Sequence, residues 1–101
     1  MKNVPEFADA VYSALKKVKR GQVTTYKKLA NAIGHPHAAR AVGNALSKNP
    51  NAPRVPCHRV VKSDGTLGGY AQGTKAKKRL LQSEGIKIEK GKIFKFNEHL
   101  I

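Results

Sequence analysis

The sequence predicts a mostly α-helical fold with small β elements, and three observations lead to this prediction. Apolar residues recur at helical spacing in four segments, near residues 5–20, 26–33, 36–48 and 74–84. The second and third segments are separated only by a short turn that contains Gly34, the pattern of a helix-turn-helix. Runs of β-prone residues are short and lie between these segments or after them. At 101 residues the chain has the length of a single domain, and we expect residues 1–101 to form one.

The first helix is expected from about Pro5 to Arg20. Proline suits the first turn of a helix, because it lacks only a backbone N–H that would have no partner there. Lysines gather near the C-terminal end, where cations are favoured, and Gly21 is expected to end the helix. The apolar stripe consists of Phe7, Val11, Leu15 and Val18.

The two helices of the helix-turn-helix differ in their outer faces. A threonine of the extended run 23–25 is placed to cap the second helix. On the third helix, Ala38, Val42, Ala45 and Leu46 face the core. Its outer face has small and polar residues with one long cation: Arg40, Gly43, Asn44 and Ser47, with Ala41 at the flank. Such a face allows close approach of a nucleic-acid groove, although an ordinary solvated surface is the alternative.

The C-terminal half alternates turns and short regular segments. Val60-Val61-Lys62 and Thr66-Leu67 flank Asp64-Gly65 and read as a hairpin. A glycine-rich loop, 68–73, precedes the last predicted helix, in which Ala76, Leu80 and Leu81 form the buried stripe. Residues 86–96 read as a second hairpin around Lys90-Gly91-Lys92.

Charge is the most unusual global property of the chain. Twenty Lys and Arg against six Asp and Glu give a formal net charge of +14. An excess of this size suits a polyanionic partner such as nucleic acid, with a merely solvated or thermophilic surface as the alternative. The glycine-rich loop lacks the context of a phosphate-binding loop, so no nucleotide cofactor is expected. A single cysteine excludes an internal disulfide, and with four histidines no metal site is expected. The chain shows no membrane-span or signal-peptide pattern, and we expect a reducing, intracellular setting.

The lone cysteine lies in the run Pro56-Cys57-His58-Arg59-Val60. A proline stiffens the turn before it, and a thiol is a strong nucleophile once a neighbouring base removes its proton. The alternative is a buried, inert cysteine, the commoner role of that residue. Glu84 falls on the inward side of the last helix, at the end of the helix dipole that disfavours an anion. We expect it either to have a cationic or hydrogen-bonded partner or to lie at a frayed, exposed end. Together Cys57, His58 and Glu84 provide the parts of a thiol–imidazole–carboxylate relay.

These residues resemble the active-site motif of the O6-alkylguanine–DNA alkyltransferases. The resemblance extends over about residues 7–84 in the same order. Residues 21–26 resemble the entry to the family's helix-turn-helix, and 38–43 resemble its recognition helix. Asn49-Pro50 resembles the loop that follows, and 69–85 resembles the glycine-rich loop and final helix.

The resemblance implies a winged helix-turn-helix-like catalytic domain that repairs DNA by direct reversal. Cys57 would take the alkyl group from guanine O6 irreversibly, once per molecule, after the base is flipped out of the duplex. His58, through a water and held by Glu84, would accept the thiol proton, while Tyr70 and the Ala71 N–H would assist the leaving oxygen. The remaining implied roles concern DNA. Arg40 would fill the gap left by the base, Tyr26 would contact the target nucleotide, and Ala39, Ala41 and Gly43 would lie near the minor groove. The carbonyls of Cys57 and Val60 would accept from the guanine amino group, and Asn49 would brace the turn.

Two departures from the family pattern affect these expectations. Many members carry an extra N-terminal domain, so the chain reads as a minimal form, a part of a longer protein, or one half of a fusion. Gln72 stands where a second glycine is often seen, which bears on the pocket's tolerance for bulky alkyl groups. We expect a monomer that acts on double-stranded DNA in the cytoplasm, or in the nucleus of a eukaryote.

Three other functions fit part of the sequence. The alkyltransferase-like proteins bind the lesion without repairing it, but they replace the nucleophilic cysteine, often by tryptophan. A winged-helix regulator would explain the charge and the helix-turn-helix but not Cys57, His58, Tyr70 and Glu84. A thiol hydrolase or a redox sensor would use the cysteine but not the basic helix-turn-helix.

Overall fold

The computed structural model describes residues 3–48, 55–70 and 72–101, with side chains described from Phe7 onward. Helices dominate and the strands are only two residues long, as predicted. In chain order the elements are α1 Asn3–Leu15, β1 Thr24–Thr25, α2 Tyr26–Ala32, α3 Ala39–Ser47, the 3-10 helix η1 Cys57–Arg59, β2 Val60–Val61, α4 Thr74–Ser83, β3 Ile88–Glu89, β4 Lys92–Ile93 and α5 Phe96–His99.

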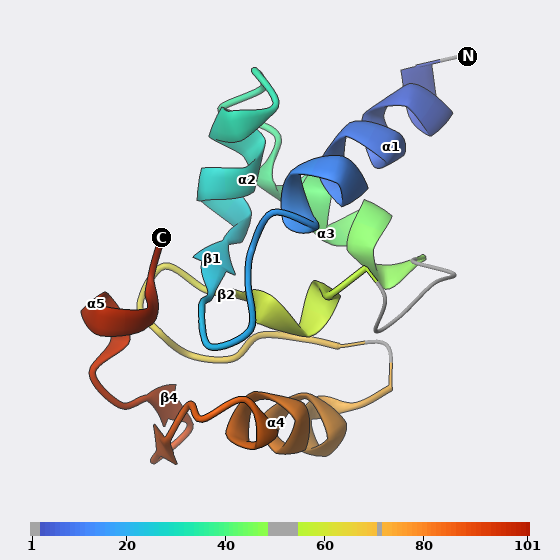
Figure 1. Ribbon diagram of the computed structural model, residues 1–101. Helices are drawn as coiled ribbons and strands as arrows, with labels where there is room; N and C mark the ends of the chain where they lie inside the picture. Colours follow the sequence, from blue (N-terminus) through green and yellow to red (C-terminus); the bar gives the residue numbers. More distant parts are fainter. Residues whose placement is uncertain (1–2, 49–54, 71) are drawn as a thin grey trace.

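Helices α1, α2 and α3 pack together in one half of the molecule, the upper half in Figure 1. Val11 and Leu15 of α1 and Val42 of α3 are fully buried between them, and Leu29 of α2 completes the contact. The predicted inner faces of the first and third helices are therefore confirmed. Cys57 belongs to this same core, which places the thiol at its edge rather than on a mobile surface loop.

A second core is covered by α4 and the C-terminal hairpin, two elements that lie in the lower half of Figure 1. It consists of Val23, Val61, Leu67, Leu81, Ile86 and Ile93. Strands β1 and β2 run between the two cores: Val60 contributes to the first core and Val61 to the second. This follows from the alternation of side chains along a strand. The chain just before β2, which carries Cys57, is thus supported from both sides.

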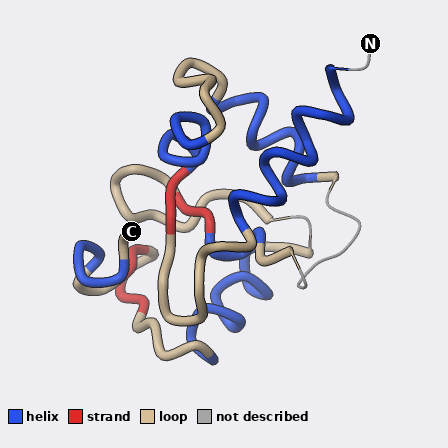
Figure 2. The backbone as a smooth tube through the Cα atoms, turned by 45° about the horizontal axis from the view of Figure 1, so that its top comes forward, coloured by secondary structure: helices blue, strands red, loops and turns tan. Residues whose placement is uncertain are grey.

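The two central strands pair in parallel, with Thr24 opposite Val60 and Thr25 opposite Val61. Figure 2 shows them side by side between the helices. The predicted hairpin of 60–62 with 66–67 is only partly correct. The turn forms, with Lys62 N donating to Thr66 O over 2.9 Å, but β2 pairs with β1, which lies more than thirty residues earlier in the chain. Thr66 instead forms an antiparallel bridge with Lys92 of the C-terminal hairpin.

The first helix ends at Leu15, five residues before its predicted end. After the 3.0 Å bond from Lys16 N to Tyr12 O, the next bonds close tighter turns, including Val18 N to Leu15 O. The turn buries the Val18 side chain and presents its carbonyl to Arg59, whose Nη1 donates to it over 2.8 Å. This tertiary contact holds the turn that follows the helix.

The helix-turn-helix forms as predicted. Thr25 caps α2, because its side-chain oxygen accepts from Lys28 N over 3.0 Å. Helix α3 begins at Ala39 rather than near Pro36, since Ala38 N bonds to His35 O in a turn that precedes it. Helix α4 ends at Ser83, with Glu84 as its cap and Gly85 in a left-handed conformation, φ +88°.

The C-terminal hairpin is confirmed, with Ile88 opposite Ile93. The short helix α5 that follows was not predicted, and its last residues return to the start of β1. Val23 N donates to His99 O over 2.9 Å, and Ile101 N donates to Val23 O over 3.1 Å. Within the described ranges, no helix has the length and apolar character needed to cross a membrane.

Candidate active site and DNA-binding surface

Cys57 is presented by a rigid turn, as the sequence predicted. Its N–H donates to Val55 O over 2.8 Å, and Arg59 N donates to Pro56 O over 2.9 Å. The first bond closes the turn before Cys57, and the second, together with Val60 N to Cys57 O, forms the 3-10 helix η1, after which the chain extends into β2 at Val60. The Cys57 residue is 6 % exposed. The thiol is therefore nearly buried and lacks a disulfide partner, so access to it depends on an adjoining cavity.

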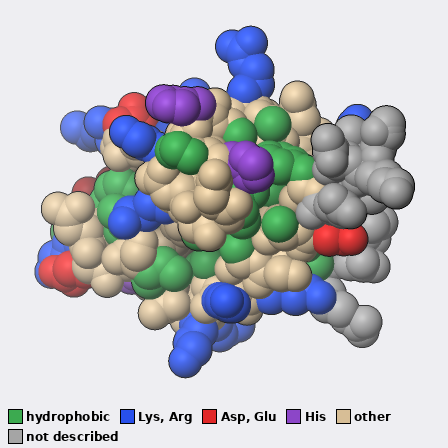
Figure 3. All heavy atoms as spheres, turned by 90° about the horizontal axis from the view of Figure 1, so that it is seen from above, with side chains coloured by type: hydrophobic (Ala, Val, Ile, Leu, Met, Phe, Trp, Pro, Cys, Tyr) green, Lys and Arg blue, Asp and Glu red, His purple; other side chains and the backbone are tan. Residues whose placement is uncertain are grey.

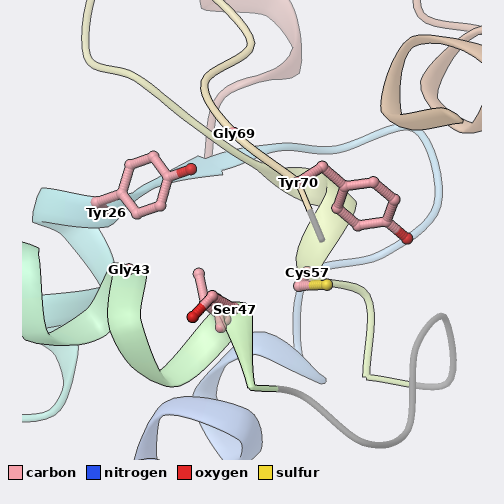
Figure 4. Close-up of a pocket in the computed structure, with 7 residues that line it drawn as sticks. Tyr26, Gly43, Ser47, Cys57, Gly69 and Tyr70 are labelled. Atoms are coloured by element: carbon pink, nitrogen blue, oxygen red, sulfur yellow. The ribbon is translucent and has the colours of Figure 1, made fainter. Parts of the chain in front are cut away.

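Such a cavity, of about 240 Å³, opens beside Cys57. It is smaller than the roughly 300–1,000 Å³ typical of pockets for drug-sized ligands. Figure 4 shows Tyr26 and two α3 residues, Gly43 and Ser47, across the cavity from Cys57 and Tyr70. The complete lining is Tyr26, Gly43, Leu46, Ser47, Cys57, Gly69 and Tyr70. The helix-turn-helix and the thiol thus form opposite walls of one cavity.

Glu84 has both a hydrogen-bonded partner, His58, and a cationic partner, Arg59, as the sequence predicted. His58 Nε2 lies 2.9 Å from Glu84 Oε2. The Arg59 guanidinium binds the same carboxylate with two bonds, from Nε to Oε1 over 2.9 Å and from Nη2 to Oε2 over 2.8 Å. The Glu84 side chain is only 7 % exposed, so the alternative of a frayed end is excluded.

The electrostatics of this cluster favour a neutral histidine beside an ionised carboxylate. Burial lowers the pKa of His58 below its ordinary value of 6.5, although Glu84 opposes that shift. Burial raises the pKa of Glu84, but hydrogen bonds from Arg59 and His58 outweigh it and leave that pKa below its ordinary value. With Nε2–H donating to Glu84, the basic atom of His58 is Nδ1. Nδ1 is buried and forms no hydrogen bond within the described residues.

The two tyrosines of the cavity keep their hydroxyl protons. Burial is the main cause that raises the pKa of Tyr26 and of Tyr70, and the neighbouring Cys57 adds to it in both cases. Tyr70 also meets His58 edge to face, with ring centroids 6.4 Å apart. Both phenols therefore keep a proton to donate, and the Tyr70 hydroxyl is hydrogen-bonded to the Cys57 side chain.

The remaining predicted DNA-contacting residues lie outside the cavity. Arg40 and Ala41 are exposed on α3, and Ala39 is half-buried at its start. Ala41 lines a separate groove between α1 and α3, with Phe7 and Tyr12. The structure therefore groups Gly43 with the thiol and places the other residues of the recognition helix beside it. Two further predictions, on Asn49 and Ala71, fall outside the described residues.

The two carbonyls expected to accept from guanine already have internal donors. Cys57 O accepts from Val60 N, and Val60 O accepts from Lys77 Nζ over 2.6 Å. A carbonyl has two lone pairs, so each can accept once more. Val60 is not among the residues that line the cavity.

Sequence reasoning missed two residues of this site. Arg59 holds Glu84, and its signal was available: it follows His58 directly, and Glu84 needed a cation. Lys77 is fully buried in α4, although the helical pattern placed Ala76, Leu80 and Leu81 inside. Its spacing carried a signal, because Lys77 lies three residues before Leu80 and four before Leu81, on the same helix face, whereas Lys75 and Lys78 fall toward the outer face.

The visible face of the molecule in Figure 3 is rich in basic side chains. In Figure 3 lysine and arginine side chains project around the outline of the visible face, whereas acidic side chains show at only a few points. Among the described residues, no group of three or more His, Cys, Asp or Glu side chains is placed to hold a metal ion.

The comparisons with known proteins agree on one family. Residues 6–86 match the model for "6-O-methylguanine DNA methyltransferase, DNA binding domain". The methylated-DNA–protein-cysteine methyltransferase of Metallosphaera sedula is 49 % identical over 87 residues, which cover 86 % of this chain and 54 % of that protein. The namesake in Methanosarcina acetivorans is 49 % identical over 80 residues, covering 79 % of this chain and 51 % of that protein. This chain thus spans about half the length of these two curated relatives.

Two solved structures show the same fold. Schizosaccharomyces pombe Atl1, crystallised with damaged DNA containing O6-carboxymethylguanine, is 32 % identical with a TM-score of 0.86, covering 96 % of this chain and 95 % of Atl1. The OGT protein of Mycobacterium tuberculosis in complex with DNA is 44 % identical with a TM-score of 0.78, covering 79 % of this chain and 49 % of that one. The fold, the ordered motifs and the matched family model agree: this chain belongs to the 6-O-methylguanine DNA methyltransferase family.

Proposed function

We propose that this protein repairs DNA by moving an alkyl group from O6 of a guanine to the sulfur of Cys57. One observation carries the proposal. The lone thiol lines a cavity of about 240 Å³, and the residue that follows it is a histidine kept neutral by burial and held by an ionised, buried carboxylate. A cysteine kept only for packing would have no need of this arrangement.

The reaction is a displacement at the alkyl carbon. The C–S bond forms as the C–O6 bond breaks, and the electron pair of that bond stays on the purine. The thiol proton passes to His58 Nδ1 through a water molecule and finally replaces the alkyl group on the guanine. Glu84 holds the imidazole by its 2.9 Å bond to Nε2 and stabilises the imidazolium that forms transiently.

Tyr70 and Tyr26 act on the base. Each keeps its phenolic proton, so Tyr70 donates toward the leaving O6 while Tyr26, on the opposite wall, contacts the target nucleotide. A guanine reaches this cavity only when it is rotated out of the duplex, at a cost of a few kcal/mol. Arg40, exposed on α3, fills the space that the base leaves in the stack.

A second function is binding of the lesion without transfer. The observation that favours it is the structural similarity to Atl1, with a TM-score of 0.86 against 0.78 for the OGT protein. Cys57 distinguishes the two functions. A binding-only protein has no need of a thiol with a proton acceptor beside it, so we place transfer first.

An intact-mass experiment separates the two functions. The protein is incubated with a duplex oligonucleotide that contains O6-methylguanine, and the masses of protein and DNA are measured afterwards. Transfer predicts that the protein gains one methyl group, that the DNA loses one, and that Cys57→Ala abolishes both changes while leaving DNA binding intact. An unmodified wild-type protein bound to an unrepaired oligonucleotide would contradict transfer and support lesion binding alone.

A further inference from the structure

Lys77 is the largest fully buried side chain in the described part of the protein, with an exposure of 0 %. Its Nζ donates to Val60 O over 2.6 Å and to Gly69 O over 3.1 Å. No carboxylate of the described residues pairs with it. A lysine is almost never fully buried without a charged partner, because removing an ammonium from water is costly. An apolar side chain on α4 would avoid this cost, so the lysine calls for a reason other than packing.

The two carbonyls belong to the two segments that carry the reacting groups. Val60 begins β2, three residues after Cys57. Gly69 lines the cavity and directly precedes Tyr70 in the glycine-rich loop. The Lys77 ammonium also lies 6.0 Å from the centroid of the Tyr26 ring on the opposite wall. One cation on α4 therefore links the nucleophile's strand to the loop of the proposed oxygen-contacting tyrosine.

We propose that Lys77 is a positioning residue for alkyl transfer, and that its ammonium group fixes the distance between Cys57 and Tyr70 by joining the Val60 and Gly69 carbonyls. This inference rests on the proposed function of Cys57. The Gly69 side of the loop has open space around it, since a Cβ on Gly69 would meet nothing within 4 Å. Charge-assisted bonds are about twice as strong as neutral ones, which suits an anchor at that point of the loop.

The charge of this anchor responds to pH. Burial lowers the pKa of Lys77 to about 8, while Cys57 acts in the opposite direction. The titratable groups that face it are Cys57 and His58 of η1 and Tyr26 of α2. Above about pH 8 the ammonium becomes an amine, with one proton fewer and weaker bonds to the carbonyls. Tyr26 and Tyr70 do not titrate there, because their pKa values lie above 10.0.

The first measurement is the rate of methyl transfer from O6-methylguanine in duplex DNA, followed from neutral pH to well above the Lys77 pKa. We expect the wild-type rate to fall with a midpoint near pH 8. Lys77→Arg stays charged and should remove this alkaline fall. Lys77→Met should slow transfer at neutral pH by about ten- to a hundredfold, the order expected for misplaced reacting groups. Lys78→Met is the matched control, an exposed lysine on the same helix, and should change neither rate nor profile.

The second measurement does not depend on activity. Amide hydrogen exchange of residues 68–70 should accelerate in Lys77→Met, while amides of α1 and α3 keep the protection they have in the wild type. Should the wild-type protein transfer no methyl group, the proposed function fails, whereas the exchange experiment still shows whether Lys77 holds the loop. The inference is overturned if Lys77→Met matches Lys78→Met in loop exchange, or if Lys77→Arg keeps the wild-type alkaline fall. The arginine variant serves this purpose even where the methionine variant does not fold.

Discussion

His58 and Glu84 meet over 2.9 Å inside the protein, and their pKa values shift in directions that suit a proton relay. A neighbouring carboxylate ordinarily raises the pKa of a histidine and favours its protonated form. Here burial dominates and keeps the ring neutral, while Arg59 holds the carboxylate in its charged form. The carboxylate therefore orients the imidazole without permanently protonating it. This division of labour depends on Arg59, whose two bonds to Glu84 satisfy an anion at the unfavourable end of α4.

Because of the same pKa shifts, the free energy of unfolding should decrease in acid. The folded-state pKa of His58 lies below 6.5, so the unfolded chain binds a proton first and stability falls as pH drops below about 6.5. Glu84 adds a further loss as pH falls below 4.5 toward its lower folded-state pKa. Urea unfolding at a series of pH values measures both parts. The variant His58→Gln should no longer lose stability as pH drops below about 6.5, but it should still lose stability below pH 4.5. An unchanged pH dependence in that variant would mean that His58 is not the group responsible.

Among the helices and strands, prediction from sequence succeeded where the pattern that decides the structure is local. The helix-turn-helix, the Thr25 cap and the end of α4 before Gly85 are each set by residues within a few positions. It failed where a distant contact decides. Helix α1 stops at Leu15 and is followed by a turn whose Val18 carbonyl bonds to the distant Arg59, and β2 pairs with β1 rather than with its own hairpin.

The same distinction separates the parts of the site that could be predicted from those that could not. The lone Cys57 with His58 beside it, and Glu84 in a position that required a partner, are all visible in the sequence. The inward position of Lys77 is visible too, three residues before Leu80 and four before Leu81, but its partners are not, because they are two backbone carbonyls and a carbonyl has no residue type by which it could be recognised.

The glycine-rich loop provides a test at this scale, because its glycines have different surroundings. Gly68 has φ +74°, and a Cβ there would lie 3.0 Å from the Tyr26 hydroxyl. Gly68→Ala should cost about 1–2 kcal/mol for the left-handed conformation alone, and it should also displace Tyr26 and slow transfer. Gly69→Ala, next to it, has open space and no left-handed φ, and is the control for stability. Thermal unfolding compares the two variants, and equal losses of stability would contradict a special conformation at Gly68.

The recognition helix α3 gives a second test. Arg40 is exposed and lies outside the cavity, so its proposed role is to stabilise the flipped state of the duplex rather than to act on the base. Arg40→Ala should slow transfer from O6-methylguanine in duplex DNA and leave the reaction with free O6-benzylguanine nearly unchanged. Arg79→Ala, an exposed arginine on α4, should affect neither substrate. Equal losses on duplex and free base would refute the role given to Arg40.

At the scale of the whole molecule, two small cores meet at the strand pair that supports Cys57, and a formal charge of +14 surrounds them. The cluster of Cys57, His58 and Glu84 does not by itself require a positive charge of this size. It fits attraction to the DNA backbone, which brings the protein to DNA regardless of sequence and leaves recognition of the damaged base to the cavity.

DNA binding should therefore weaken steeply with salt. The logarithm of the binding constant should fall linearly with the logarithm of salt concentration, with a slope of about −0.9 for each phosphate contacted. Lys27 is exposed directly after Tyr26, which lines the cavity, and Lys27→Gln should reduce the slope by roughly one contact. Lys90→Gln changes the tip of the β3–β4 hairpin, in the other half of the molecule, and should leave the slope unchanged. A flat salt dependence would exclude phosphate contacts as the source of affinity.

The central claim is that Cys57 is consumed by the reaction, and its stoichiometry tests this most directly. Duplex DNA containing O6-methylguanine is supplied in large excess over the protein, and repaired guanine is counted over time, with the modified peptide located by mass spectrometry. We predict that repair stops once each molecule has removed one methyl group, and that this group is found on Cys57. Continued turnover, a methyl group on another residue, or lesions that persist beside a free thiol would contradict it.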